Sequence, residues 1–100
     1  MNKLSIKAQK VLDRILNGDI PKQTHVTGSL VRGIKAGKQS ILFPNGEKVH
    51  PAIIESLSSA DLIERKTISK FGTWGYMESN YGFYPKGKAP EGKPEENYVL

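Results

Sequence analysis

The sequence contains no cysteine and only two histidines among its 100 residues. The absence of cysteine excludes a disulfide framework and any metal site built on thiolates. His25 and His50 lack the histidine and carboxylate spacing of a zinc motif, so we expect no bound metal. A phosphate-binding loop, a dinucleotide-binding fingerprint and a Gly-x-Ser-x-Gly elbow are also missing. We therefore expect no cofactor and predict that the protein is not an enzyme.

Long hydrophobic runs are missing as well. The first apolar segment, Leu4–Leu16, is interrupted by four charged side chains, which excludes a signal-peptide core or a membrane span. With 37% hydrophobic and 25% charged residues, the composition is that of a globular chain. We expect a soluble cytoplasmic protein with one domain over residues 1–85. Residues 86–100 contain two prolines, two glycines and six charges, and we expect them to form a mobile tail.

What the sequence does have is an unevenly distributed positive charge. The net charge is +5; residues 1–50 hold nine Lys or Arg against three Asp or Glu, whereas residues 51–100 hold six against seven. A positive field raises the rate of encounter with polyanions, although a net charge of this size also serves solubility. The first half of the chain is therefore the candidate for contact with nucleic-acid phosphates.

Hydrophobic periodicity predicts an amphipathic helix over Leu4–Leu16. At about 100° per residue, one face collects the apolar side chains Leu4, Ala8, Val11, Leu12, Ile15 and Leu16. Asn2 or Ser5 can cap its start, and Asn17-Gly18 suits its end. The opposite face carries a basic row, which is either an ordinary solvated face or a set of phosphate contacts. This row consists of Lys3, Lys7, Lys10 and Arg14.

Residues 20–50 lose the helical period. β-Branched residues alternate with glycines up to Gly37, and a second apolar run, Ser40–Phe43, ends at Pro44-Asn45-Gly46. Asn-Gly supplies the positive φ angles of a tight turn, so Glu47–Val49 can return as a strand. We predict two to four short antiparallel strands in this region.

A second helix is predicted from His50-Pro51 to Ala60-Asp61, because proline is well suited to the first helical position. A strand is expected over residues 62–68, followed by a glycine-hinged connection over residues 71–75. One or two further strands are expected around Glu78-Ser79-Asn80. Six of the eight aromatic residues lie between positions 71 and 84, so this segment is expected to close the core.

The stretch Val49–Arg65, in which a helix leads through Leu62-Ile63 into a strand, resembles the third helix and first wing strand of winged-helix proteins. The order of elements is also similar to that of small bacterial proteins of the YjhX putative-toxin type. The resemblance implies a compact winged-helix-like α+β domain, built as helix–strands–helix–β-hairpin, with Lys66–Tyr84 as the wing. It implies DNA binding by such a small bacterial or phage protein.

Two features depart from the winged-helix pattern. Residues 20–50 have strand and turn character where a winged helix has its second helix. The predicted recognition helix, Pro51–Asp61, carries Glu55 and Asp61 and no basic or amide side chain. Recognition helices normally present Arg, Lys, Asn or Gln to base edges. If the protein binds nucleic acid, we expect other elements to make the contacts.

Two further groups are candidates for those contacts. The first group is a set of basic residues that recur every three positions among small neighbours: Arg32, Lys35 and Lys38. These side chains could contact successive phosphates, or they could belong to a solvated basic hairpin. The second group consists of Lys70, Phe71 and Trp74. It could stack an unpaired base, although aromatic clusters of this density more often belong to a core.

Three functions are thus compatible with the sequence. The first is a small basic module that binds nucleic acid through the first helix, the 32–38 region and Lys70. Such a module could also form a homodimer. The second is a phage- or plasmid-encoded inhibitor that binds a host defence complex, of the anti-CRISPR type. The third is a toxin-type ribonuclease that uses His25 or His50 with Arg32 or Lys35.

Overall fold

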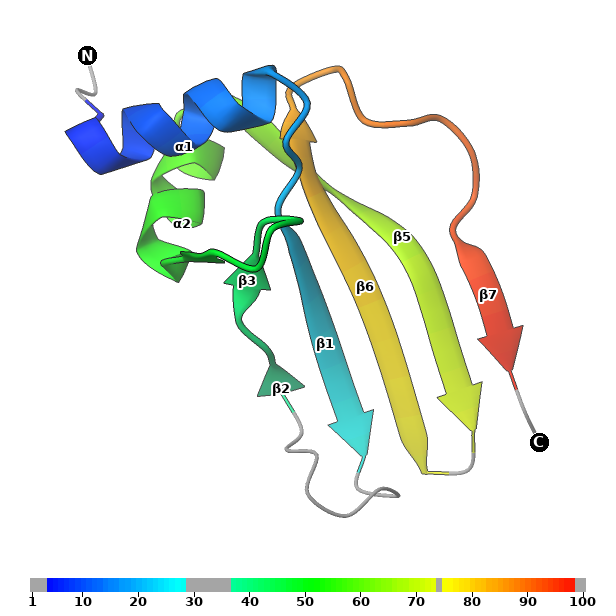
Figure 1. Ribbon diagram of the computed structural model, residues 1–100. Helices are drawn as coiled ribbons and strands as arrows, with labels where there is room; N and C mark the ends of the chain where they lie inside the picture. The colour runs from blue at the N-terminus through cyan, green and yellow to red at the C-terminus, as the bar shows by residue number, and fades with distance from the viewer. Residues whose placement is uncertain (1–3, 29–36, 74, 99–100) are drawn as a thin grey trace.

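The computed structural model describes residues 4–28, 37–73 and 75–98, arranged as in Figure 1. They form two helices and seven strands, which confirms the α+β class. Lys3, Arg32, Lys35 and Trp74 lie outside the described residues. In chain order the elements are α1 (Ile6–Leu16), β1 (Lys22–Gly28), β2 (Gly37–Lys38), β3 (Ile41–Leu42), β4 (Lys48–Val49), α2 (Pro51–Ser59), β5 (Ile63–Thr73), β6 (Tyr76–Pro85) and β7 (Glu95–Tyr98).

Helix α1 begins and ends where its capping residues predict. The Ser5 hydroxyl oxygen accepts a hydrogen bond from the Ala8 N–H at 3.1 Å, and Asn17 caps the C-terminus ahead of Gly18, whose φ is +92°. The expectation that Leu16 belongs to the buried face is wrong, because its side chain is 58% exposed. Leu16 lies about 100° around the helix from the buried Ile15, and so beyond the edge of the apolar stripe.

Helix α2 also follows its sequence signals. Pro51 occupies the first turn, and the Nδ1 atom of His50 accepts a hydrogen bond from the Ala52 N–H at 3.1 Å. The helix buries Ile54 and Leu57 and ends at Ala60. His50 is therefore the N-cap that its position before Pro51 predicts.

The strands form one sheet in the order β4-β3-β1-β6-β5-β7, with β2 also paired to β1. All pairs are antiparallel except β5–β7. Strands β1 to β4 confirm the predicted antiparallel strands between residues 20 and 50. The Asn45-Gly46 turn is present: the Phe43 N–H donates to the Glu47 carbonyl and the Gly46 N–H to the Phe43 carbonyl, both at 2.8 Å.

The hairpin of β5 and β6 is longer than the sequence indicates. The expected connection over residues 71–75 is wrong, because β5 continues to Thr73, which pairs with Tyr76. Strand β6 is likewise one continuous strand of 10 residues. The register shifts by one residue at Ile68, so that Thr67 pairs with Tyr81 and Ser69 with Asn80. Backbone pairing over this length overrides the glycine signal at Gly72.

The segment expected as a tail contains a strand. Residues 95–98 form β7, which runs parallel to β5 and pairs Lys70 with Glu96 and Gly72 with Tyr98. All four residues of β7 are exposed, so hydrophobic burial could not have predicted it. Its pairing uses backbone groups, which every residue except proline carries in full.

Side chains alternate between two faces of the sheet. We call them the Phe83 face, which also carries Tyr81 and Ser79, and the Asn80 face, which also carries Glu78 and Tyr76. On β1, His25 belongs to the Phe83 face and Thr24 to the Asn80 face, because directly paired residues share a face.

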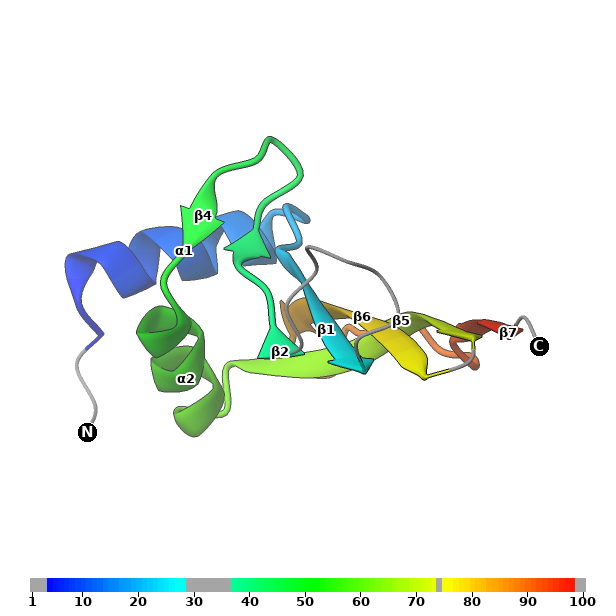
Figure 2. The ribbon, with the colours of Figure 1, turned by 90° about the horizontal axis from the view of Figure 1, so that it is seen from below.

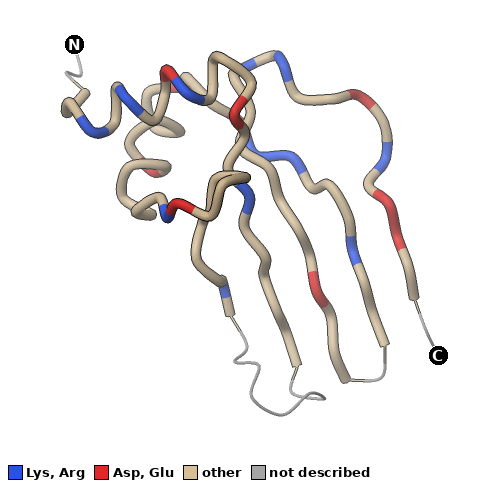
Figure 3. Tube along the Cα trace, viewed as in Figure 1, with Lys and Arg blue, Asp and Glu red and all other residues tan. Residues whose placement is uncertain are grey.

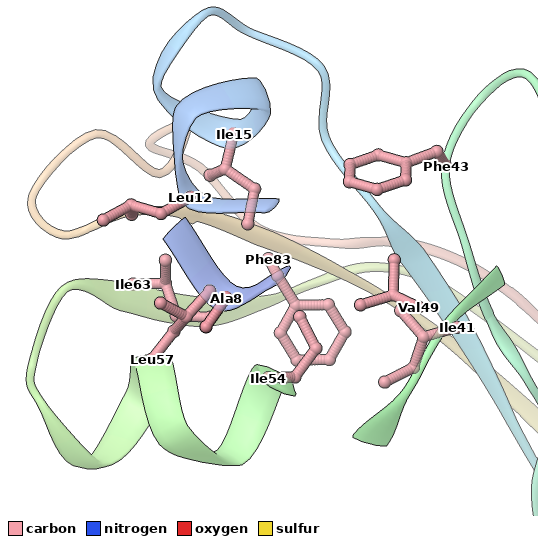
Figure 4. Packing of buried hydrophobic residues seen from close by; sticks show 10 residues of the cluster. All are labelled: Ala8, Leu12, Ile15, Ile41, Phe43, Val49, Ile54, Leu57, Ile63 and Phe83. Carbon is pink, nitrogen blue, oxygen red and sulfur yellow. The ribbon is translucent and has the colours of Figure 1, made fainter. Parts of the chain in front are cut away.

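The main core lies between the two helices and one end of the sheet (Figure 4). Ile15 and Leu57 are fully buried, and Phe83 is the aromatic residue that β6 contributes to this cluster. The expectation that residues 71–84 close the core is confirmed for Phe83 and is wrong for Phe71. Phe71 is 37% exposed, and Tyr76 is buried outside the main cluster. The other members of the cluster are Ala8, Leu12, Ile41, Phe43, Val49, Ile54 and Ile63.

Half of the sheet extends beyond the helices. In Figures 1 and 2 both helices lie at one end, and the far ends of β1, β5, β6 and β7 project away from them. The molecule measures 48 × 30 × 25 Å, so it is elongated along this projection. Neither described helix covers the projecting half.

Candidate nucleic-acid interface

A groove of about 330 Å³ separates α1 from the β3–β4 turn and the start of α2. We call it the α1 groove. Lys7, Lys10 and Arg14 line it from α1, and Lys48 lines it from β4. Its remaining lining residues are Val11, Phe43, Glu47 and Ile53. In Figure 3 basic positions recur along α1 and at β4, with the acidic residues Asp13, Asp19 and Glu47 in the same region, and two consecutive acidic residues lie at the opposite edge on β7.

Arg14 ties the two walls of the α1 groove together. Its guanidinium contacts Asp19 at 2.7 Å and Glu47 at 2.6 Å, and its Cζ atom lies 3.7 Å from the centroid of the Phe43 ring. The hydrogen bond between Arg14 and Glu47 raises the pKa of Arg14, and the same bond lowers the pKa of Glu47. Arg14 is thus bound to its own chain and positions the groove, whereas the sequence suggests it as one of a row of phosphate contacts.

Lys7, Lys10 and Lys48 form no ion pair with any described residue, and all three are exposed. Three unpaired ammonium groups around one groove produce a local positive potential. Lys48 was missed by the sequence analysis. Alternation with the buried Val49 could have predicted that Lys48 points outward, but only the folded chain brings it to α1.

The remaining predicted cations lie on the sheet. Lys38 is exposed on β2 opposite His25, and Lys70 lies on β5 opposite Ser79; both belong to the Phe83 face. Of the predicted row Arg32, Lys35 and Lys38, the structure describes the position of Lys38 alone. The other two residues lie outside the described part of the chain.

Lys70 and Phe71 do not form one stacking group, because these consecutive strand residues point to opposite faces. Trp74, the third residue of the predicted group, lies outside the described residues. The Phe71 ring instead packs edge-on against Tyr76, with 6.1 Å between ring centroids. Lys70 shares its face with Met77 and with Tyr98 of β7.

The Asn80 face carries a hydrogen-bonded row that joins three strands. The Thr24 hydroxyl donates to Oδ1 of Asn80 at 2.6 Å, and Nδ2 of Asn80 donates to the Ser69 hydroxyl at 3.1 Å. The Tyr76 hydroxyl donates to Glu78 at 2.8 Å, which raises the pKa of Tyr76. This row lies along an open hollow of about 720 Å³, and it satisfies polar groups that the sheet partly buries.

The two histidines lie on different elements. His25 is on β1, and His50 caps α2 with its Nδ1 atom engaged by the Ala52 N–H. Within the described residues no three His, Asp or Glu side chains gather closely enough to hold a metal ion. The described helices also include none that is long and apolar enough to cross a bilayer.

No protein-family model, curated protein or solved structure matches this chain.

Proposed function

We propose that this protein is a small, basic, non-enzymatic module that binds nucleic-acid phosphates through the α1 groove. The observation that carries the proposal is the convergence of Lys7, Lys10 and Lys48 on one groove without an ion-pair partner among the described residues. Phosphate contacts supply most of the affinity of non-specific nucleic-acid binding, and lysine makes them as a point charge.

The arrangement of α2 supports a winged-helix-like version of this proposal. Helix α2 leads within a few residues into β5, which pairs with β6 in a long hairpin. In this proposal, the β5–β6 hairpin is the counterpart of the wing. Between α1 and α2, strands take the place of the second helix of a winged helix. Glu55 and the serines of α2 are exposed and lack the basic and amide groups that read bases, so we assign the phosphate contacts to the α1 groove.

Salt dependence of duplex binding tests the proposal. Fluorescence anisotropy with a labelled DNA duplex should give a plot of log affinity against log salt whose slope falls by about 2.7 when Lys7, Lys10 and Lys48 are all replaced by Gln, at about 0.9 for each lost phosphate contact. Affinity should fall similarly for duplexes of different sequence, because phosphate contacts carry no base information.

A matched control separates the groove from the net charge. The triple replacement of Lys66, Lys88 and Lys93 by Gln removes the same charge from β5 and from the segment between β6 and β7. Its effect on the slope should be small. If both triple variants lose affinity equally, net charge alone drives binding, and the α1 groove is not the site. If the unaltered protein binds no nucleic acid at low salt, the proposal is wrong.

A second candidate function is the inhibition of a host protein complex. It is favoured by β7, the last strand of the sheet in the described part of the chain, whose residues are all exposed. An open edge strand can pair with a strand of another protein or of a second copy. A pull-down from nuclease-treated lysate distinguishes the two functions, because loss of every partner after the treatment supports nucleic-acid binding.

A further inference from the structure

The projecting half of the Phe83 face combines cations with exposed apolar and aromatic side chains. One cross-strand row contains Lys38, His25, Ser79, Lys70 and Glu96. The neighbouring row toward the tip contains Thr27, Met77, Gly72 and Tyr98. These rows cross five and four strands respectively. Lys38, at one end of the first row, borders α2 across a groove, and the far ends of β1, β5 and β6 project away from both helices (Figures 1 and 2).

Tyr98 is held against the sheet by Gly72. A Cβ atom built on Gly72 would lie 2.6 Å from Cδ1 and 3.0 Å from Cε1 of Tyr98, and 3.3 Å from the sulfur of Met77. The Tyr98 ring therefore occupies the space that any larger residue at position 72 would need. Tyr98 is still 51% exposed, and Met77 is 38% exposed. An aromatic ring supported on one side and open on the other is a platform on which a base can stack.

A second platform lies closer to the helices. The Cζ atom of Arg65 is 4.5 Å from the centroid of the Tyr81 ring, so the guanidinium rests on the ring. Arg65 also lines a groove of about 410 Å³ with Lys38, Gln23 and Glu55, between α2 and the Phe83 face. A guanidinium supported in this way can stack with a base and also contact a phosphate.

The charge of this surface favours an anionic ligand. Lys38, Arg65 and Lys70 contribute three positive charges, against the carboxylates of Glu96, opposite Lys70, and Glu55, at the groove near α2. Bases in a duplex are stacked on each other and cannot lie on a tyrosine ring, whereas bases in a single strand can.

We propose that the Phe83 face binds single-stranded nucleic acid, with bases stacked on Tyr98 and Arg65 and phosphates contacted by Lys38 and Lys70. This inference rests on the proposed function and adds to it a preferred form of nucleic acid and a second surface. A single strand would run across the strands from the groove beside α2 toward β7. The α1 groove would contact phosphates of either form.

Binding of 15-nucleotide oligo-dT, 15-nucleotide oligo-rU and a 15-base-pair duplex to the full chain tests the inference. Fluorescence anisotropy should show tighter binding of the single strands than of the duplex at the same salt concentration. The two oligonucleotides distinguish DNA from RNA, and tighter binding of either one supports the inference. Equal or tighter binding of the duplex would contradict it.

Two variants test Tyr98 in different ways. Tyr98→Ala should weaken single-strand binding by about 5- to 150-fold, the range for the loss of one stacked base, whereas Tyr98→Phe should keep most of the affinity. Gly72→Ala removes no charge and no aromatic ring but displaces the Tyr98 side chain, so it should weaken binding in the same direction. Neither change should alter duplex binding by more than about twofold, since a base in a duplex is not free to stack on Tyr98.

Phe71→Ala is the matched control, because Phe71 is an exposed aromatic residue on the neighbouring strand β5, where it lies on the opposite face of the sheet. It should change single-strand affinity less than twofold. If Tyr98→Ala and Phe71→Ala have equal effects, the Phe83 face is not the binding surface. If the triple groove variant weakens duplex binding while Tyr98→Ala changes nothing, the proposed function stands and this inference fails. If none of the three nucleic acids binds, both fail.

Discussion

The close approach of Gly28 to the β5–β6 turn leads to a quantitative prediction for Gly28→Ala. Gly28 ends β1 with a φ of +93°, and an added Cβ atom would lie 1.8 Å from the Gly75 carbonyl oxygen. Ordinary van der Waals contact begins at 3.4 Å. The substitution therefore forces the end of β1 away from the turn, and it also places a side chain in the left-handed region.

Gly46 allows the two effects to be separated. Its φ is +92°, almost the same as that of Gly28, but an added Cβ atom would meet nothing within 4 Å. Gly46→Ala should cost about 1–2 kcal/mol, the penalty for left-handed backbone alone. Gly28→Ala should cost about 2–5 kcal/mol, because forced displacement in a packed region adds about 1–3 kcal/mol to the same backbone penalty.

Urea unfolding followed by circular dichroism measures both free energies of unfolding. The two variants should share the m-value of the unaltered protein and differ in midpoint, with Gly28→Ala the lower. A difference of 1 kcal/mol corresponds to about 4–8 °C in the melting temperature of a domain of this size, so thermal melts provide a second measurement. Equal losses in the two variants would refute the close approach of β1 to the β5–β6 turn.

Two other predictions concern the core and the α1 groove. Leu57 is fully buried, so Leu57→Ala should lower the free energy of unfolding by about 2–5 kcal/mol, whereas Leu57→Met should cost less than about 1.5 kcal/mol; similar losses in both would contradict the packing described. The pKa of Glu47 is lowered mainly by the hydrogen bond from Arg14, so its contribution to stability should be complete above its unfolded-state pKa and disappear as the pH falls through the lowered value. Urea midpoints between neutral pH and pH 3 should consequently fall less steeply for Glu47→Gln than for the unaltered protein, and identical profiles would show that the Arg14–Glu47 pair does not act in solution.

Short sequence signals, such as helix caps and turn residues, correctly predicted both helices and the turn between β3 and β4. Ser5 and Gly18 bound α1, Pro51 begins α2, and Asn45-Gly46 forms the turn between β3 and β4. Each of these depends on contacts within a few residues, such as a side-chain cap or a positive φ angle. The prediction of these elements was correct because no distant residue competes with such contacts.

Elements that depend on distant partners were missed or truncated. Strand β5 carries charged and polar residues through its middle and Gly72 near its end, so the sequence predicts a shorter strand; β6 and β7 extend it through backbone pairing. The lysines of the α1 groove show the same difference between local and distant signals. Lys7 and Lys10 were predicted from their helical spacing, whereas Lys48 joins them only when β4 packs near α1.

The position of β1 inside the sheet has a consequence for the order of folding. Thr24 bonds to Asn80 across 56 residues, whereas Thr73 and Tyr76, at the turn of the β5–β6 hairpin, are nearly adjacent in the chain. Closing a loop of that length costs about 3.5 kcal/mol in chain entropy, while a hairpin forms within microseconds. During synthesis, β1 leaves the ribosome well before its partner β6 has been made. We therefore expect the β5–β6 hairpin to provide the edge to which β1 is added, and φ-values in the hairpin to exceed those in β1.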